Sequence, residues 1–192
     1  MIDTLIHYDK ELFFYLNSLG NPTWDGFWLW VTHKFSWIPF YALLLFLVFK
    51  KLGWKAGVLT MVVVAGMIAT TDQIANFFKF TVERLRPCQD GVFDEAIRFV
   101  APYCGKYGYL SGHASSSMAL AVYIGLLLKS HYPKLIFIML CYAVLVSYSR
   151  IYVGVHYPLD IISGMAMGAI VGFVYYNIQR FFQTRFKLVS AA

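Results

Sequence analysis

The chain has 192 residues, of which 59% are hydrophobic and only 14% are charged, and its mean hydropathy is +0.60. Soluble domains carry about 25% charged residues, so this composition excludes an ordinary water-soluble protein, a disordered chain and a collagen-like chain. The net charge of +6 would suit nucleic acid only if the basic residues formed a solvated face, and the apolar excess argues against such a partner. The composition favours a lipid bilayer as the surroundings of this chain instead.

Residues 1–35 contain no clean membrane span, because Asp9, Lys10 and Glu11 interrupt the first apolar stretch. Several tryptophans follow between residues 24 and 37, and tryptophan is enriched at the headgroup level of membranes. The sequence therefore predicts N-terminal interfacial helices within 1–35, with a sixth span left open. No basic leader with a small-residue cleavage site is visible, so we expect this N-terminus to be the mature one.

Five long apolar runs follow along the chain. A helix needs about 20 residues to cross the hydrocarbon layer, so the shorter runs need flanking residues or a tilt. The sequence predicts an all-α, polytopic membrane helix bundle with five to six transmembrane helices and a single domain over residues 1–192. The runs are 37–49, 57–78, 110–128, 135–149 and 161–179.

The charged residues divide between the two predicted faces of the membrane. Eight basic residues occupy one set of connections without any acidic neighbour, which marks that face as cytoplasmic. The opposite face receives the N-terminal segment, an outer loop at 79–109 and the turn at 150–157. On this face Arg84, Arg98 and Lys106 could contact a lipid headgroup, but we expect them to be solvated loop charges. The eight basic residues are Lys50, Lys51, Lys55, Lys129, Lys134, Arg180, Arg185 and Lys187.

Two features of the spans have open interpretations. Gly164, Gly168 and Gly172 recur every four residues, which allows close helix packing, either within this chain or, less readily, in a homodimer. Asp72 is a carboxylate inside an apolar run, where it serves either a function or, slightly favoured, a helix-to-helix hydrogen bond.

Three short stretches on the outer face contain the polar groups that could perform chemistry. Because the spans alternate in direction, these helix ends share one leaflet and can converge. The stretches are 79–87, with Lys79, Arg86 and Pro87; 111–113, with Ser111, Gly112 and His113; and 149–160, with Ser149, Arg150, His156 and Asp160.

The residue types in these stretches suit phosphoryl transfer. Lys79, Arg86 and Arg150 can bind phosphoryl oxygens, and free backbone amides at a helix beginning near 111 add to that anion site. The i,i+4 spacing of His156 and Asp160 lets the carboxylate orient the imidazole as a nucleophile.

His113 comes from another helix and is a candidate general acid for the leaving oxygen. Taken singly, these residues also have structural explanations: interface anchoring for Lys79 and Arg86, a helix-end polar group for His113, and a structural pair for His156 and Asp160. Their combination favours a phosphohistidine mechanism in which cations and amides, and no metal, hold the transition-state charge.

The same residues resemble the type 2 phosphatidic acid phosphatase (PAP2) superfamily. Its signature is K-x6-R-P, then P-S-G-H, then S-R-x5-H-x3-D. The first and third parts are complete here, whereas Leu110 replaces the proline of the second part, which affects only the loop geometry before the helix. The resemblance covers about residues 79–160.

The resemblance implies a metal-independent, cofactor-free membrane phosphatase that acts on lipid phosphates or pyrophosphates. It assigns His156 as nucleophile, Asp160 as its orienting carboxylate and His113 as the acid for the leaving group. The residues that it assigns to phosphate binding are Lys79, Arg86, Ser111, Gly112 and Arg150.

The substrate itself is less defined by the sequence. A short outer loop with no headgroup domain favours undecaprenyl pyrophosphate at the outer side of a bacterial-type inner membrane. The alternatives are phosphatidylglycerophosphate, phosphatidic acid and lipid A phosphate. A vanadate-binding haloperoxidase and a non-enzymatic transporter remain as competing classes.

The three cysteines separate into one inside a span, Cys141, and two in the outer loop, Cys88 and Cys104. An oxidising exterior favours a disulfide between Cys88 and Cys104 over two free thiols, and it would stabilise the loop by about 3 kcal/mol. Two cysteines without a nearby histidine do not suit a zinc site.

Overall fold

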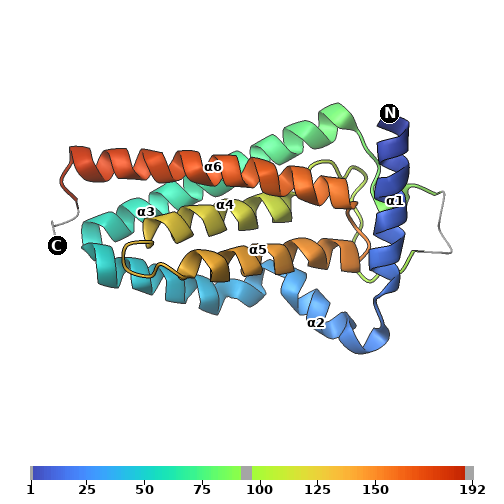
Figure 1. The fold of residues 1–192 in the computed structure, drawn as a ribbon, viewed down its shortest axis with the longest axis horizontal. Coiled ribbons are helices and arrows are strands. Elements are labelled where there is room, and N and C mark those ends of the chain that lie inside the picture. Colours follow the sequence, from blue (N-terminus) through green and yellow to red (C-terminus); the bar gives the residue numbers. More distant parts are fainter. Residues whose placement is uncertain (1, 92–96, 189–192) are drawn as a thin grey trace.

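The computed structural model describes residues 2–91 and 97–188, so part of the predicted outer loop, with Asp94 and Glu95, lies outside the described residues. Figure 1 shows an all-helical bundle, which confirms the predicted fold class, and no strand occurs within the two described ranges. Two short 3-10 helices, η1 (Lys34–Trp37) and η2 (Pro87–Gln89), join longer elements. The α-helices are α1 (Ile2–Ser18), α2 (Pro22–Thr32), α3 (Ile38–Val82), α4 (Gly112–Leu127), α5 (Leu135–Tyr152) and α6 (Pro158–Arg185).

Helix α3 consists of two arms that meet at a bend at Gly53. This residue has φ 81° and ψ 173°, a backbone conformation that favours glycine because any Cβ would be strained. The bend turns the chain back, so the arms run in different directions along the bundle (Figure 1). The predicted run 57–78 therefore lies on one arm of α3, and the run 37–49 lies on the other arm apart from Trp37, which ends η1.

Helix α4 lies at the centre of the bundle and packs against α3, α5 and α6. None of its 16 residues is exposed, which explains why it has no charged side chain and why its apolar residues are not confined to one face. The other predicted runs match α5 and α6, and α6 continues to Arg185, beyond the predicted end at 179.

The three glycines of α6 face α4 in the same chain. A Cβ added to Gly164 would lie 2.8 Å from the carbonyl oxygen of Ser111, and one added to Gly168 would lie 2.2 Å from that of Ser115. Such distances leave no room for a side chain, so α4 and α6 approach at nearly backbone contact. The glycines thus pack within the chain, and a homodimer stays a separate prediction.

The two ends of the bundle differ in their content. The α3 bend, the α4–α5 connection and the C-terminal end of α6 lie together at one end, and these segments contain the eight basic residues (Figure 1). Helix α1, the segment between α3 and α4, and the α5–α6 turn lie at the other end. Every stretch with the predicted chemistry therefore belongs to one end of the molecule.

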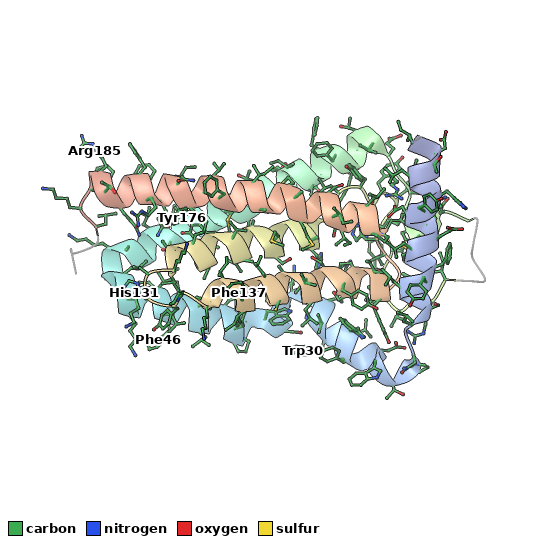
Figure 2. All side chains as sticks on the ribbon, in the orientation of Figure 1. Trp30, Phe46, His131, Phe137, Tyr176 and Arg185 are labelled. Carbon is green, nitrogen blue, oxygen red and sulfur yellow. A yellow bond between two sulfur atoms is a disulfide. The ribbon has the colours of Figure 1, made fainter. Side chains whose placement is uncertain are left out.

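Within the described ranges, three helical stretches are long and apolar enough to cross a membrane: Lys34–Val82, α5 and α6. The first folds back at Gly53, and α4 is a shorter apolar helix, so five or six crossings remain the prediction. Large apolar side chains cover the sides of the bundle; Phe46 and Phe137, both labelled in Figure 2, are 57% and 66% exposed. Such a surface suits lipid contact.

Helix α1 lies across the end of the bundle (Figure 1). Asn17, near its end, donates from Nδ2 to the carbonyl oxygens of Ile151 and Tyr152, with distances of 3.1 and 3.0 Å. The opposite face of α1 exposes apolar side chains such as Leu5 and Leu12. Both N-terminal helices are present, and their position in the membrane interface stays a prediction.

Candidate active site

The turn between α5 and α6 holds His156 against Asp160. Nδ1 of His156 lies 3.3 Å from Oδ2 of Asp160, and the same oxygen accepts a 3.1 Å hydrogen bond from the backbone N–H of Tyr157. Pro158 begins α6, where its missing N–H is not needed. Because the carboxylate favours a proton on Nδ1, Nε2 of the neutral ring retains its lone pair.

A cavity of about 820 Å³ brings most of the predicted site residues together. Six of the eight line it, and they come from α3, the segment after α3, α4, α5 and the α5–α6 turn. The six are Lys79, Arg86, Gly112, His113, Arg150 and His156.

The remaining two predicted residues, Ser111 and Asp160, are fully buried beside the cavity. Ser111 caps α4: its Oγ accepts a hydrogen bond from the backbone N–H of Ala114, and its own N–H donates to the carbonyl oxygen of Asp160 at 3.0 Å. Ser111 thus connects the start of α4 to the start of α6. Contact of its hydroxyl with a phosphate stays a prediction.

The three predicted cations are each held by a neighbouring group. Lys79 donates from Nζ to the side-chain oxygen of Asn76 at 3.2 Å, and Arg86 donates from Nε to the carbonyl oxygen of Tyr107 at 2.9 Å. This contact uses only the Nε of Arg86.

Arg150 donates from Nη1 to the hydroxyl of Thr32 in α2. In the described part of the chain, no atom accepts a hydrogen bond from its buried Nε. A buried cationic donor of this kind favours an anion nearby. The cation cluster, which consists of Lys79, Arg86 and Arg150, is therefore suited to a phosphoryl group.

Gly108 closes the site from the segment before α4. A Cβ at this position would lie 3.0 Å from Oδ2 of Asp160 and 3.0 Å from Cγ of Arg86. A side chain here would require Arg86 or Asp160 to shift, so glycine allows the close approach of the backbone to both groups.

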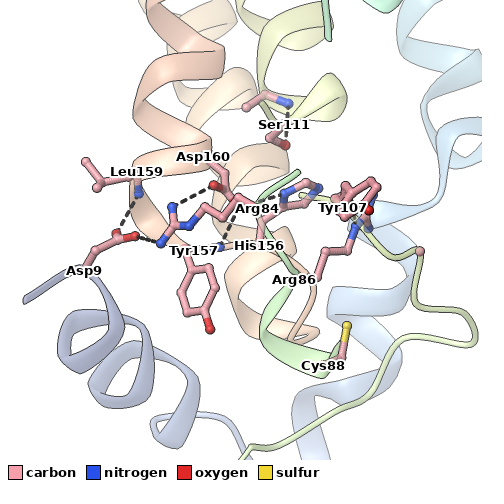
Figure 3. Close-up of polar contacts among 12 residues, drawn as sticks. Asp9, Arg84, Arg86, Cys88, Tyr107, Ser111, His156, Tyr157, Leu159 and Asp160 are labelled. Carbon is pink, nitrogen blue, oxygen red and sulfur yellow. Dashed lines mark hydrogen bonds and ion pairs between the residues drawn. The ribbon is translucent and has the colours of Figure 1, made fainter. Parts of the chain in front are cut away.

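The structure corrects the sequence interpretation of Arg84. We expected a solvated loop charge, yet its side chain is only 17% exposed and forms two ion pairs. Nη1 lies 2.9 Å from Oδ1 of Asp160, and Nη2 contacts Oδ2 of Asp9 in α1 (Figure 3). Burial opposes the charge on Arg84, but Asp160 and Asp9 outweigh it and raise the pKa of the guanidinium. Arg98 is likewise paired, with Asp25.

Asp72 fits neither of its two interpretations fully. It lines the cavity, and its Oδ2 accepts a 3.2 Å hydrogen bond from Nδ2 of Asn76, one turn later on the same helix. Asn76 in turn accepts from Lys79, so the three side chains form a row along α3. The contact lies within one helix and does not join two.

We expect His156 to remain neutral as the pH falls through 6.5. Burial and three nearby cations lower the pKa of its imidazole well below the ordinary 6.5, because each opposes a positive charge on the ring. The cations are Arg86, Arg150 and Lys79. Nitrogen chemical shifts of histidine-labelled protein in detergent, assigned with the His156→Ala protein, measure the midpoint. A midpoint at or above 6.5 would contradict this expectation.

Beyond the cation cluster, the same cavity continues as an apolar channel into the bundle. Both arms of α3 line it, together with α4 and α5. Its walls are mostly aliphatic, with two tyrosines whose hydroxyls pair at 2.7 Å, Tyr41 and Tyr142. The aliphatic lining residues include Leu44, Leu45, Val48, Met61, Val64, Ile68, Leu120, Ile124 and Val146.

A disulfide joins Cys88 to Cys104 in the outer loop. It lies close in sequence to Arg86 and to Tyr107, the residue whose carbonyl oxygen holds Arg86. The disulfide therefore closes a loop between residues 88 and 104, and Arg86 and Tyr107 lie just outside the two ends of this loop. Among the described residues, no group of three or more His, Cys, Asp or Glu side chains could hold a metal ion.

Comparison with known proteins identifies the family. The family model described as PAP2 superfamily matches residues 54–183. The chain belongs to the PAP2 superfamily. This confirms the resemblance drawn from the three sequence stretches, and the protein is a PAP2-type lipid phosphatase and a multi-pass membrane protein.

Two curated relatives match nearly the whole PAP2 chain. The lipid A 4'-phosphatase of Bacteroides thetaiotaomicron is 34% identical over 181 residues, covering 93% of this chain and 80% of the relative. The undecaprenyl-diphosphatase of Sulfolobus acidocaldarius is 35% identical over 178 residues, covering 91% and 80%.

A solved structure supports the PAP2 fold. The PAP2-type phosphatidylglycerolphosphate phosphatase of Bacillus subtilis superposes with a TM-score of 0.72 at 20% identity, covering 93% of this chain and 87% of that one. At this identity the likeness concerns the fold alone.

Proposed function

We propose that this PAP2 phosphatase removes a phosphate group from a membrane lipid through a phosphohistidine on Nε2 of His156. One observation carries the proposal: a single cavity joins the cation cluster to an apolar channel inside the bundle. A lipid phosphate has the same two parts, a charged group and a hydrocarbon chain. Such a cavity binds both at once.

In the first step, Nε2 of His156 attacks phosphorus, so a P–N bond forms while the P–O bond to the lipid breaks. His113 donates a proton to the departing oxygen, and the lipid leaves as an alcohol or, from a pyrophosphate, as a monophosphate. Asp160 holds the ring while positive charge develops on it.

In the second step, water attacks the phosphohistidine while His113 accepts its proton. The P–N bond breaks, which releases inorganic phosphate and restores His156. Lys79, Arg86 and Arg150 hold the negative charge of the phosphoryl oxygens in both steps. We expect free backbone amides at the start of α4 to bind the same oxygens.

The relatives favour two substrates. Two curated lipid A 4'-phosphatases match more than nine-tenths of this chain, so a lipid A phosphate is the first candidate. Undecaprenyl pyrophosphate, favoured by the sequence, is the second, because an undecaprenyl-diphosphatase matches with similar identity. We further propose that the site opens to the outer side of a bacterial-type inner membrane, since the basic residues lie at the opposite end.

Phosphate release from a panel of purified lipids in detergent tests the function. The panel contains lipid A 4'-phosphate, undecaprenyl pyrophosphate, phosphatidylglycerophosphate and phosphatidic acid, with the His156→Ala protein as blank. We expect release from at least one lipid, unchanged by a chelator, and a kcat/KM preference that ranks the candidates.

Release no greater than the blank from every lipid would overturn the proposal. Halide oxidation by vanadate-loaded protein would favour the haloperoxidase alternative instead. Solute flux without phosphate release would favour the transporter alternative.

A further inference from the structure

A row of contacts connects the N-terminal helix to His156. Oδ2 of Asp9 pairs with Nη2 of Arg84, and Nη1 of the same guanidinium donates to Oδ1 of Asp160 at 2.9 Å. The other oxygen of Asp160 faces Nδ1 of His156 (Figure 3). The two oxygens of Asp160 therefore have different partners: Oδ1 pairs with the cation, and Oδ2 faces the imidazole and accepts from the backbone N–H of Tyr157.

Asp9 also holds the backbone beside Asp160. Its Oδ1 accepts a 2.8 Å hydrogen bond from the N–H of Leu159, one of the N-terminal donors of α6 that has no partner within the helix. Asp9 thus contacts the first turn of α6 twice, directly through Leu159 and indirectly through Arg84.

The row is buried, so each charged group in it needs a partner of opposite charge or a hydrogen bond. The side chains of Asp9 and Asp160 are 2% and 0% exposed, and the guanidinium of Arg84 lies between them, 4.3 Å from the ring centre of Tyr157. Without Asp9, the cation would have one buried carboxylate left, and a bidentate pair with both oxygens of Asp160 would become its best arrangement. That arrangement would compete with His156 for Oδ2.

We propose that Asp9 is a positioning residue of the phosphatase, which acts through Arg84 to keep Oδ2 of Asp160 available to His156. This inference rests on the proposed function. The lipid phosphate is bound by other residues, so the loss of Asp9 should slow the chemical step and leave phosphate binding unchanged.

The test compares Asp9→Asn with Asp25→Asn in the full-length protein in detergent. Asparagine keeps an oxygen for Leu159 but removes the charge that faces Arg84. Asp25 is a matched control, because it also pairs an N-terminal helix with an arginine, Arg98, but among the described residues its side-chain partners are Arg98 and Tyr152 and do not include Asp160.

We expect Asp9→Asn to lower kcat by about 10- to 100-fold, the usual effect of losing a group that orients a functional side chain. Inhibition by inorganic phosphate should stay within about threefold of wild type, because the three cations are intact. Asp25→Asn should keep the wild-type kcat. An unchanged kcat in Asp9→Asn, or an equal loss in Asp25→Asn, would overturn the proposal.

If Asp9→Asn alone unfolds at a lower temperature than wild type, the double variant Asp9→Asn/Arg84→Gln provides a second test of the proposal, because it removes both charges of the pair. If Asp9 acts through Arg84, the double variant should have the kcat of Arg84→Gln alone. Independent, multiplying losses would contradict the proposal. A wild-type protein that released no phosphate would instead refute the proposed function.

Discussion

Replacing His156 by alanine is expected to reduce kcat by about 10⁴-fold or more, as the loss of a nucleophile does in enzymes with covalent intermediates. The imidazole is the group that forms the P–N bond, and the remaining cations cannot replace it. Acid-labile phosphate on the wild-type protein during turnover, absent from the variant, would report the intermediate. Phosphate binding should persist, since Lys79, Arg86 and Arg150 remain.

His131→Ala is the control for this substitution. His131 lies in the α4–α5 connection, at the opposite end of the bundle from the site (Figure 2), and its Nδ1 lies 3.0 Å from the hydroxyl oxygen of Ser130. We expect it to keep wild-type activity. A His156→Ala protein with more than about one per cent of wild-type kcat would rule out His156 as the nucleophile.

Replacing Gly168 by alanine is expected to lower both stability and activity. The new Cβ would lie 2.2 Å from the carbonyl oxygen of Ser115, a backbone atom that cannot rotate away, so α4 and α6 must separate. Overpacking of this kind costs about 1–3 kcal/mol, occasionally more. Because α4 provides His113 and α6 provides Asp160, the same separation should also reduce kcat.

Gly26→Ala provides the matched comparison, since Gly26 lies in α2 and no atom would come within 4 Å of its Cβ. Alanine favours a helix by up to about 1 kcal/mol over glycine, so this variant should melt no earlier than wild type. Thermal unfolding in detergent measures both. Equal melting temperatures for the two variants would show that the α4–α6 contact tolerates a side chain.

Much of the site was predictable because its residues occupy helix ends whose side of the membrane follows from the order of apolar runs. Arg86, His113 and His156 come from three different parts of the chain, and alternation of direction predicts that their helix ends share one leaflet, where they can converge. The structure brings all three to one cavity. The predicted apolar runs match helices for a similar reason, since a long apolar run is typical of a helix with apolar surroundings.

Asp9 and Arg84 were missed because their role depends on where α1 packs, which no local pattern reports. In the sequence Asp9 only interrupts an apolar stretch, a signal read as an interfacial helix. The structure shows that the same carboxylate faces inward, while apolar side chains of α1 such as Leu12 face outward. A charge inside an apolar segment could have suggested a buried partner, but not which arginine.

The contacts of α1 also have a consequence for biosynthesis. Asn17 binds the carbonyl oxygens of Ile151 and Tyr152, which are made 134 and 135 residues later, and Asp9 binds Leu159 after 150 residues. Helix α1 therefore cannot complete these contacts until α5 and the start of α6 have been made, although Arg84, the other partner of Asp9, is made earlier. Such long-range closure is slow, so we expect the docking of α1 to be a late step in folding.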